Sequence, residues 1–460
     1  MCCCSIPDTR PYVHKIATGR CAEFNSLRQT GGLSGYPSRT ESIHDVIENS
    51  HASTALSYAH GLGKVFALHG SADRRVVTIV GDGTLTDGMC RETLNNLGAA
   101  PDRPVIIVLN DNGRSSSPTA GGLAATPQTG NSVFENLGLA YLGPVDGHDI
   151  AKMESACGTP AGCAAPLWCI ASPARAWVTR QPSATTQITC TPSASSIPAP
   201  AGPGPRANPT GPRYFADEIT AIGAARPDVV CVTAAMLHPT GLDRFAARFP
   251  DRVFDLGIAE QHAVTSATRA GPRRAPLVLA LYSTFVSRAF DQLLTDVALH
   301  RLPVTLVLDR AGSAARTGPA TTACGMRRLC RSCPGLRIAA PRDCTELREL
   351  LREAAGISDG PTVIRYPKAT LGPDIPAIGK IGQGDVLRND AAALGLLVTV
   401  GAQAGPCLTA AHELAAHNVP VTVVNPRWIA PVNLALLTLA AAHRLVLTVE
   451  DSACLRTTQP

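Results

Sequence analysis

The motif Gly81-Asp82-Gly83 directly follows one apolar stretch of the chain, and the motif Asn110-Asp111-Asn112 follows the next. A carboxylate after a strand, followed by glycine and a helix, suits a divalent cation that bridges a diphosphate, because glycine allows close approach of the backbone and a helix N-terminus favours anionic oxygen. Asp82 and Asn112 stand at the carboxyl ends of consecutive predicted strands, where open α/β sheets bind ligands. Gly-Asp-Gly alone would favour an ordinary strand-to-helix turn with Asp as the helix cap. The addition of Asn112 at this spacing shifts the interpretation to a metal–diphosphate site.

A second candidate for chemistry is Glu260, which lies just after a predicted strand in the segment FDLGIAEQHAV. Taken alone, this glutamate is equally well explained as a helix cap. The pairing of Gly-Asp-Gly with a later Asn resembles the fingerprint of enzymes that use thiamine diphosphate. In those enzymes a glutamate hydrogen-bonds the aminopyrimidine ring of the cofactor and promotes the imino tautomer that deprotonates the thiazolium carbon. The resemblance therefore implies a catalytic role for Glu260.

The elements that must position these residues alternate between strand and helix patterns. RRVVTIV and PVIIVLN are short stretches rich in β-branched residues, and DGMCRETLNNLGAA between them has the pattern of a helix. This alternation predicts an α/β fold with a parallel sheet and helical crossovers. We expect four parts along the chain: a first α/β domain at 1–156, a degenerate or disordered linker without periodicity at 157–212, a second α/β domain at 213–375, and a third, incomplete one at 384–460.

Composition narrows the class of protein. The chain has 460 residues, of which 45% are hydrophobic and 17% charged, and this suits a soluble α/β protein of two or three domains. The net charge of +5 is mild and unclustered, and it gives no argument for nucleic-acid binding. No apolar stretch approaches the length of a membrane span and the N-terminus lacks a signal-peptide pattern, so we expect a cytoplasmic protein. Of the 16 cysteines, Cys330 and Cys333 form a lone CxxC, which is a weak signal for a metal or redox site.

Several blocks of the sequence resemble one family closely. They are GGLSGYPSRTESIHDVIENSHAST, GDGTLTDGM, LNDN, YLGPVDGHD, PDRVFDLGIAEQHAV, YSTFVSRAFDQ and LDRAG, and they look like 1-deoxy-D-xylulose-5-phosphate synthase of the actinobacterial type. The resemblance implies two parallel-sheet domains that bind thiamine diphosphate, the first through its diphosphate and Mg²⁺ and the second through its pyrimidine, plus a truncated transketolase C-terminal-like α/β domain. It also implies a homodimer that condenses pyruvate with glyceraldehyde 3-phosphate, releases carbon dioxide, and serves isoprenoid, thiamine and pyridoxal biosynthesis.

The resemblance implies roles for individual residues. Magnesium would be held by Asp82, Asn112 and the backbone of Arg114. The cofactor would be lined by Ser50, His51, Ala52, Gly83, Thr84, Asn112, Glu260 and Phe285. The substrates would lie near Tyr282, Arg288, Arg310 and Lys368. At Lys368 the family places an arginine, so the charge is kept while the bidentate geometry toward phosphate is lost.

Several family residues are missing from the chain. The Gly-His-Gln before YVHK is absent, SPARAWV replaces a Lys-Gly-x-Gly-Tyr motif, and the Asp and His expected after DRAG fall on Thr317 and Thr321. A shift of the reading frame restores each motif where it is missing, if the bases are chosen within codon degeneracy. The codons of Trp168 and Cys169 leave no choice: the shifted codon must encode valine, which is the residue of the family. We therefore interpret these segments as out-of-frame stretches. The chain is also shorter than the family pattern at the N-terminus, after Gly122 and in the third domain.

Three functions stay open at this point. The first is the thiamine-diphosphate-dependent transferase described above. The second is a catalytically impaired remnant that at most binds Mg²⁺ and thiamine diphosphate. The third is a transketolase or dehydrogenase-type thiamine enzyme, which the blocks YLGPVDGHD and ENSHAST disfavour.

Overall fold

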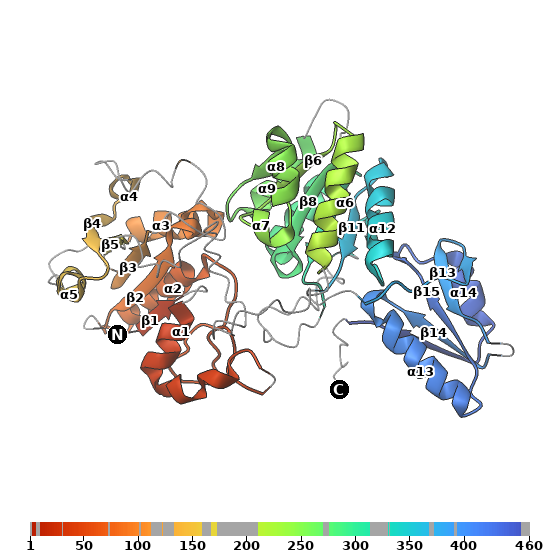
Figure 1. Cartoon of the computed structure of the whole chain (residues 1–460). Coiled ribbons are helices and arrows are strands. Elements are labelled where there is room, and N and C mark those ends of the chain that lie inside the picture. The colour runs from red at the N-terminus through yellow and green to blue at the C-terminus, as the bar shows by residue number, and fades with distance from the viewer. Residues whose placement is uncertain are drawn as a thin grey trace, which may run out of the picture. The chain divides into compact units, whose positions relative to one another are not determined.

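The structure of the chain is a computed structural model (Figure 1). It describes residues 2–5, 10–29, 31–71, 74–100, 103–111, 122, 133–158, 167–172, 210–269, 276–312, 330, 332–367, 372–390 and 393–451. The chain forms two compact units. Unit 1 comprises Met1–Ala201, Leu256–Ala259 and Ala315–Thr321, and unit 2 comprises Gly202–Asp255, Glu260–Ala314 and Thr322–Pro460.

Unit 1 contains a five-stranded sheet in the order β1-β2-β3-β5-β4, with every neighbouring pair parallel. The strands are β1 (Cys2–Ser5), β2 (Val76–Gly81), β3 (Val105–Asn110), β4 (Ala140–Asp146) and β5 (Leu167–Ser172). Residues 105–109 of β3 are all buried, because helices cover both faces of the sheet. The predicted parallel sheet with helical crossovers is therefore confirmed. Strand β5 lies inside the stretch 157–212, of which 159–166 and 173–209 lie outside the described residues.

The helices of unit 1 lie on both faces of its sheet. α2 (Thr54–Leu68) and α3 (Gly88–Gly98) cover one face, where Leu56 and Leu97 share a core cluster with Ile107 (Figure 1). α5 (Ile150–Gly158) covers the other face, where Met153 packs against the alternate side chains of β2 and β3. The shorter helices are α1 (Arg10–Lys15) and α4 (Val133–Asn136).

A buried charged cluster holds the segment between α1 and α2. Asp45 is 3% exposed and accepts hydrogen bonds from Nη1 and Nη2 of Arg20 at 2.7 and 2.8 Å. It also accepts from the backbone N of Ser38 at 2.8 Å and lies 2.9 Å from Nε2 of His14. Burial raises the pKa of Asp45, but the hydrogen bonds from Arg20 and Ser38 outweigh that effect and the pKa is lowered. The ionised carboxylate of Asp45 thus anchors the stretch of chain between α1 and α2.

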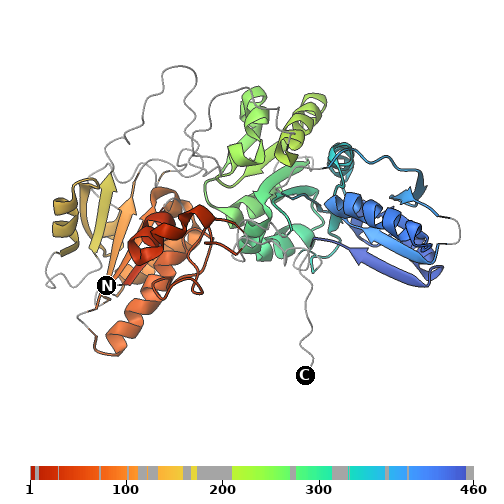
Figure 2. The same ribbon diagram turned by 60° about the horizontal axis from the view of Figure 1, so that its bottom comes forward.

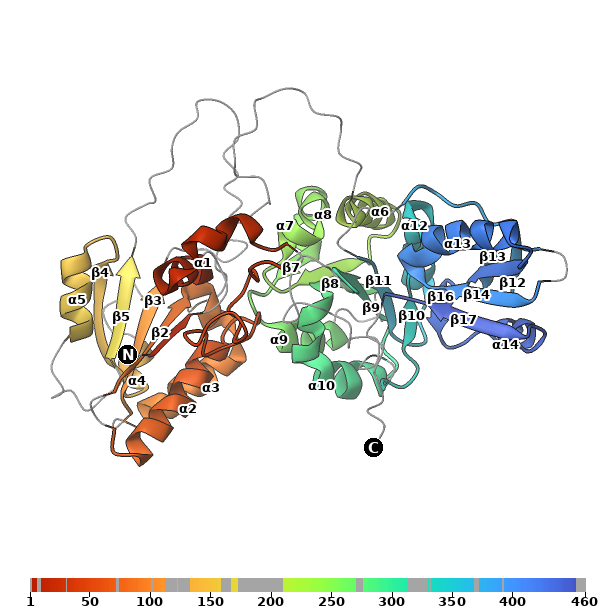
Figure 3. The ribbon, with the colours of Figure 1, turned by 90° about the horizontal axis from the view of Figure 1, so that it is seen from below.

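Unit 2 contains a seven-stranded sheet in the order β16-β10-β11-β9-β8-β6-β7, in which only β16 runs antiparallel to its neighbour. α6 (Gly211–Ala225) and α12 (Cys344–Gly356) lie side by side on one face (Figure 1), and α9 (Glu260–Ser266) and α10 (Phe290–Gln292) lie on the other (Figure 3). Two short helices contact α6: α7 (Leu237–Thr240) and α8 (Asp243–Arg248). The strands are β6 (Val230–Thr233), β7 (Val253–Asp255), β8 (Leu277–Tyr282), β9 (Val304–Asp309), β10 (Arg337–Ala339), β11 (Thr362–Arg365) and β16 (Trp428–Ala430).

A second sheet of unit 2 has five strands in the order β12-β13-β15-β14-β17. α13 (Ala404–Ala416) packs on the face that carries Leu397, and α14 (Leu434–Ala441) packs on the face that carries Leu396 (Figures 2 and 3). Successive side chains of β14 thus serve two different cores. The strands are β12 (Gly379–Ile381), β13 (Gly384–Arg388), β14 (Gly395–Thr399), β15 (Val421–Asn425) and β17 (Leu445–Val449).

A strand and a polar network connect the two sheets of unit 2. β16, which follows β15 in the chain, pairs with β10 in the seven-stranded sheet. Beside it, the fully buried Glu346 of α12 accepts hydrogen bonds from Nη1 of Arg342 at 2.8 Å and from Nδ2 of Asn425 at 2.9 Å. Arg342 also pairs with Asp385 of β13. The buried carboxyl groups of Glu346 and Asp385 are therefore both paired with the Arg342 guanidinium, and such pairing offsets part of the desolvation cost.

No helix within the described ranges is both long and apolar enough to cross a membrane.

Candidate active site

The carboxyl ends of β2 and β3 lie side by side in unit 1. Gly81, the last residue of β2, is the register partner of Asn110, the last residue of β3. Asp82 follows directly, begins a short 3₁₀ helix (Asp82–Thr86) and is 4% exposed. The paired strand ends therefore place a buried carboxylate at the edge where parallel sheets bind ligands.

The loop before α2 packs against the residues that follow β2. Oγ of Ser53 donates to the carbonyl oxygen of Thr84 at 3.3 Å. Ser53 has φ of 73°, in the left-handed region that few residues other than glycine occupy. Ser50 and Thr84 are 3% and 8% exposed. The structure thus brings the loop with the expected cofactor residues 50–52 against the segment 82–84.

Both the backbone and the ring of His51 have hydrogen-bond partners in this loop. The backbone N of His51 donates to Oδ1 of Asn49 at 2.9 Å, and ring Nδ1 lies 3.2 Å from the same oxygen. The carbonyl oxygen of His51 accepts from Oγ1 of Thr54 at 3.2 Å. Asn49 is not among the residues that the sequence pointed to. The available signal was an Asn two residues before His51, a spacing at which Asn side chains accept backbone N–H groups.

The segment just before Glu260 belongs to unit 1. The backbone N of Ile258 donates to Oγ1 of Thr86 at 2.9 Å. Gly257 has φ of 73°, and a Cβ atom there would lie 3.0 Å from the side chain of Thr86. The positive φ favours glycine here, and any Cβ atom would be tight against the Thr86 side chain. This segment contacts the 3₁₀ helix that begins at Asp82.

In unit 2, a buried ion pair stands at the start of α9. Glu260 is the first residue of α9 and is 4% exposed. Nε of Arg288 lies 3.8 Å from Oε2 of Glu260, and the Arg288 side chain is only 11% exposed. Arg288 belongs to the short 3₁₀ helix Ser283–Ala289, which also carries Phe285. The expected catalytic glutamate and two expected ligand-binding residues therefore come from neighbouring elements, since α9 contacts that 3₁₀ helix.

A stack of side chains lies at the carboxyl ends of β8 and β9. Tyr282 and Asp309, the last residues of these strands, are register partners. The ring of Tyr282 stacks on Phe285 with centroids 5.9 Å apart, and the guanidinium carbon of Arg310 lies 3.7 Å from the centroid of the Tyr282 ring. Arg310 has φ of 62°, and its backbone N donates to Oδ1 of Asp309 at 2.7 Å. Three of the expected residues are thus together, while Lys368 lies outside the described residues.

The carboxylate of Asp82 in unit 1 fits a metal ion whose other ligands include the oxygens of a diphosphate. Within the described ranges, no three His, Cys, Asp or Glu side chains are grouped so that they could hold a metal ion by themselves. Asp82 offers one buried carboxylate, and Mg²⁺ is commonly bound by one or two carboxylates together with phosphate oxygens. Asn112 and Arg114 lie outside the described residues.

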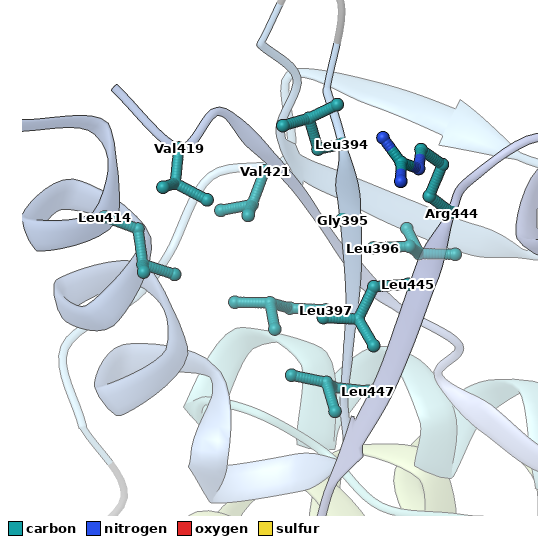
Figure 4. A pocket seen from close by; sticks show the side chains of 10 residues that line it. All are labelled: Leu394, Gly395, Leu396, Leu397, Leu414, Val419, Val421, Arg444, Leu445 and Leu447. Carbon is teal, nitrogen blue, oxygen red and sulfur yellow. The ribbon is translucent and has the colours of Figure 1, made fainter. Parts of the chain in front are cut away.

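A separate pocket of about 400 Å³ opens in the five-stranded sheet of unit 2. Figure 4 shows aliphatic side chains of β14, β15 and β17 around it, with Arg444 as the charged residue of the lining. Its lining has no carboxylate, imidazole or thiol, so it offers no group for acid–base or metal chemistry. Its lining residues are Leu394, Gly395, Leu396, Leu397, Leu414, Val419, Val421, Arg444, Leu445 and Leu447.

Comparison with known proteins decides the family. The family model described as 1-deoxy-D-xylulose-5-phosphate synthase matches residues 8–130 and 125–166. A 1-deoxy-D-xylulose-5-phosphate synthase of Frankia casuarinae is 48% identical over 494 residues, which cover 96% of this chain and 74% of the relative. The chain belongs to the 1-deoxy-D-xylulose-5-phosphate synthase family. The resemblance read from the sequence blocks is confirmed, and the expected enzyme class, a transketolase-type transferase, is confirmed at the level of the family.

The remainder of the chain matches the transketolase architecture. The pyrimidine-binding domain of transketolase matches residues 210–373, and the transketolase C-terminal domain matches residues 382–454. These matches confirm the predicted fold class. The synthase of Saccharopolyspora erythraea is 46% identical over 495 residues, covering 96% of this chain and 76% of the relative. Among solved structures, a transketolase of Pichia stipitis aligns at 14% identity and a TM-score of 0.46, over 94% of this chain and 79% of its own.

Proposed function

We propose that this chain condenses pyruvate with glyceraldehyde 3-phosphate, with release of carbon dioxide, by means of thiamine diphosphate and Mg²⁺. The observation that carries the proposal is the buried carboxylate of Asp82 at the paired ends of β2 and β3, in a chain of this family. When bound, thiamine diphosphate would supply a carbon nucleophile for the keto group of pyruvate.

Unit 1 would hold the diphosphate end of the cofactor. Asp82, together with Asn112 and the backbone of Arg114, would bind Mg²⁺. Residues 50–52 would line the cofactor with Gly83 and Thr84, and the contact between Ser53 and Thr84 keeps these two segments together. A carboxylate that is already desolvated loses little hydration when the metal arrives, which favours tight binding.

Unit 2 would hold the pyrimidine end of the cofactor. The carboxylate of Glu260 would hydrogen-bond the aminopyrimidine ring and hold a proton at that position. Because Glu260 is 4% exposed, this hydrogen bond would form in a low-dielectric environment, where it is stronger than in water. Phe285 would pack against the cofactor ring. Arg288 pairs with Glu260 and limits the orientations available to the carboxylate.

Arg310 would bind the phosphate of glyceraldehyde 3-phosphate. Its guanidinium is held over the ring of Tyr282, so less side-chain entropy is lost when the phosphate binds. Lys368 would add a second positive charge. The same proposal includes the homodimer, the cytoplasmic location, and the domain limits 1–156, 213–375 and 384–460 around the stretch 157–212.

The test combines a turnover assay with a cofactor titration. The chain is supplied with pyruvate, glyceraldehyde 3-phosphate, thiamine diphosphate and Mg²⁺, and the formation of 1-deoxy-D-xylulose 5-phosphate and carbon dioxide is measured. Calorimetry measures cofactor binding to the same protein, to Asp82→Asn and to the matched exposed variant Asp251→Asn. We expect turnover, and we expect Asp82→Asn alone to lose Mg²⁺-dependent binding.

The other outcomes separate the alternatives. Cofactor binding without turnover would support the catalytically impaired remnant, and a chain with the family residues restored in the three divergent segments would then recover activity. Transfer from a ketose phosphate donor, without use of pyruvate, would support the transketolase-type reaction. Absence of both binding and turnover in the folded chain would overturn the proposal.

A further inference from the structure

We infer that Asn49 is a positioning residue, which fixes His51 in the tautomer that carries its proton on Nδ1. The meaning of this inference for catalysis rests on the proposed function, because His51 is placed beside the cofactor there. The tautomer itself is a property of the folded chain and can be measured without turnover.

The hydrogen bonds of Asn49 determine which ring nitrogen carries the proton. The backbone N of His51 donates to Oδ1 of Asn49 at 2.9 Å, and this donor fixes the identity of the amide oxygen, since an amide nitrogen could not accept it. Nδ1 of His51 lies 3.2 Å from that same oxygen. A carbonyl oxygen only accepts hydrogen bonds, so Nδ1 must be the donor and must carry the proton.

The backbone on both sides of His51 is held in place. Oγ1 of Thr54, the first residue of α2, donates to the carbonyl oxygen of His51 at 3.2 Å. On the other side of the loop, Ile47 is buried in the core of unit 1 at 3% exposure. Ser53 is fully buried and donates to Thr84. The loop is thus fixed at both ends, and Asn49 sets the orientation of the partly buried ring within it.

The tautomer decides what His51 can do chemically. With the proton on Nδ1, Nε2 of the neutral ring is an acceptor. It can take a hydrogen bond or a proton from a hydroxyl group of a substrate, and this function requires that Nε2 be unprotonated beforehand. A free imidazole has no such fixed preference for Nδ1–H, so the orientation given by Asn49 would prepare His51 for proton transfer.

The first measurement is nuclear magnetic resonance of the whole chain labelled with ¹⁵N-histidine. The His51 signals are assigned by their disappearance in His51→Gln. In the neutral ring we expect a pyrrole-type Nδ1 and a pyridine-type Nε2. A pyrrole-type Nε2 in the unsubstituted chain would overturn the inference.

Three variants separate positioning of the ring from support of the loop. Asn49→Leu has a similar volume and removes the acceptor, so we expect the pyridine-type Nε2 signal to be lost or reduced. Asn49→Asp keeps an acceptor oxygen in reach of Nδ1, and we expect it to retain the Nδ1–H tautomer. Thr54→Val removes the hydrogen bond on the opposite side of His51 and leaves Asn49 intact, so it serves as the matched control and should also retain the tautomer.

Turnover gives the second readout. Since one hydrogen bond of this kind is worth about a factor of ten, kcat should fall about tenfold in Asn49→Leu and recover in Asn49→Asp, while KM changes little. If Asn49→Leu does not fold, the inference is still tested by the tautomer of His51 in the unsubstituted chain and in Asn49→Asp. A chain without turnover but with the Nδ1–H tautomer would refute the proposed function and leave the role of Asn49 standing. Equal tautomer ratios in the unsubstituted chain and a folded Asn49→Leu would overturn the inference.

Discussion

At the scale of single residues, each unit buries a carboxylate at its candidate site, just after β2 in unit 1 and at the start of α9 in unit 2. Asp82 and Glu260 are each only 4% exposed, and the desolvation of a carboxylate costs several kcal/mol unless partners or ligands compensate. Carboxylates in such environments concentrate at functional sites, because the low dielectric strengthens every interaction they make with a ligand. Each of the two predictions that follow concerns a side chain whose behaviour is set by its burial.

Glu260→Gln should abolish proton transfer while it preserves the shape of the site. We expect kcat to fall by about 10²- to 10⁴-fold, the usual contribution of a positioned acid or base, with a smaller change in cofactor affinity. Steady-state kinetics and cofactor titration on the same preparation measure both effects. The exposed variant Glu413→Gln is the control, and an unchanged kcat in Glu260→Gln would contradict the catalytic assignment.

The buried thiols should make the chain less stable at alkaline pH. Burial raises the pKa of Cys333 to about 11 and that of Cys330 to about 12, and it also raises the pKa of Cys90 and Cys231. Unfolded thiols have a pKa of about 8.5, so above that pH the unfolded state releases protons that the folded state retains. The thiols should therefore not change the free energy of unfolding below about pH 8.5. Above that pH, the free energy of unfolding should fall as the pH rises.

Urea unfolding at a series of pH values measures this slope. Cys231→Ala should reduce it, whereas Cys21→Ser, at an exposed position, should leave it unchanged. Equal slopes in all three proteins would show that the buried thiols do not cause the loss.

At the scale of elements, the periodic stretches were predictable and the pairing of irregular ones was not. β2, β3 and α3 follow from β-branched strands around an amphipathic helix. β1 and β5 lie in stretches with little pattern of their own and are defined by parallel register with β2 and β3. Local propensity cannot reveal a strand whose hydrogen bonds are supplied by distant neighbours.

The candidate site shows the same division. The position of Asp82 after a strand could be read from the sequence, because a Gly-Asp-Gly turn after an apolar stretch has a known geometry. The stacking of Arg310 on Tyr282 could not, because it depends on the register of β8 and β9 and on φ of 62° at Arg310. The spacing of Asn49 and His51 indicates the backbone hydrogen bond between them, but the position of the His51 ring against the same oxygen atom could not be predicted from the sequence.

The polar network between the two sheets of unit 2 should be sensitive to the loss of one partner. Arg342→Met leaves Glu346 and Asp385 buried without their shared cation, and we expect a loss of about 3–5 kcal/mol in the free energy of unfolding. The double variant Arg342→Met/Glu346→Leu should recover part of it, because it no longer buries the Glu346 charge. Denaturant unfolding measures both.

The control for this network is a surface ion pair. Arg337 pairs with Asp359, which is 71% exposed, and Arg337→Met should change stability little because solvent screens that pair. A loss in Arg342→Met no larger than that in Arg337→Met would contradict a stabilising role for the network.

At the scale of the whole molecule, the two units are not consecutive pieces of chain. Unit 1 includes the described segment Leu256–Ala259, which interrupts the chain of unit 2 in the sequence. The chain therefore passes from one unit to the other several times, and no single cut would separate them. We expect isolated halves of the chain to be poor substitutes for the full protein.

Cofactor binding should stabilise the full chain as a whole. Thiamine diphosphate and Mg²⁺ at about 100 times their dissociation constant should add about 2.7 kcal/mol to the free energy of unfolding, because they bind the folded state only. Thermal unfolding with and without the cofactor, and with a chelator, measures the effect. Asp82→Asn should lose the metal-dependent part of the shift while Asp251→Asn keeps it, and an equal shift in both would contradict the metal assignment.

The antiparallel strand β16 has a consequence for how unit 2 folds. It completes an edge of the seven-stranded sheet, yet it is made far later in the chain than its partner β10, after the strands β12 to β15 of the other sheet. Closing that pair requires a long loop to be ordered first, and contacts of large sequence separation slow folding. During synthesis the edge of β10 would stay open until β16 has emerged, after β12 to β15, so unit 2 should reach its native state late.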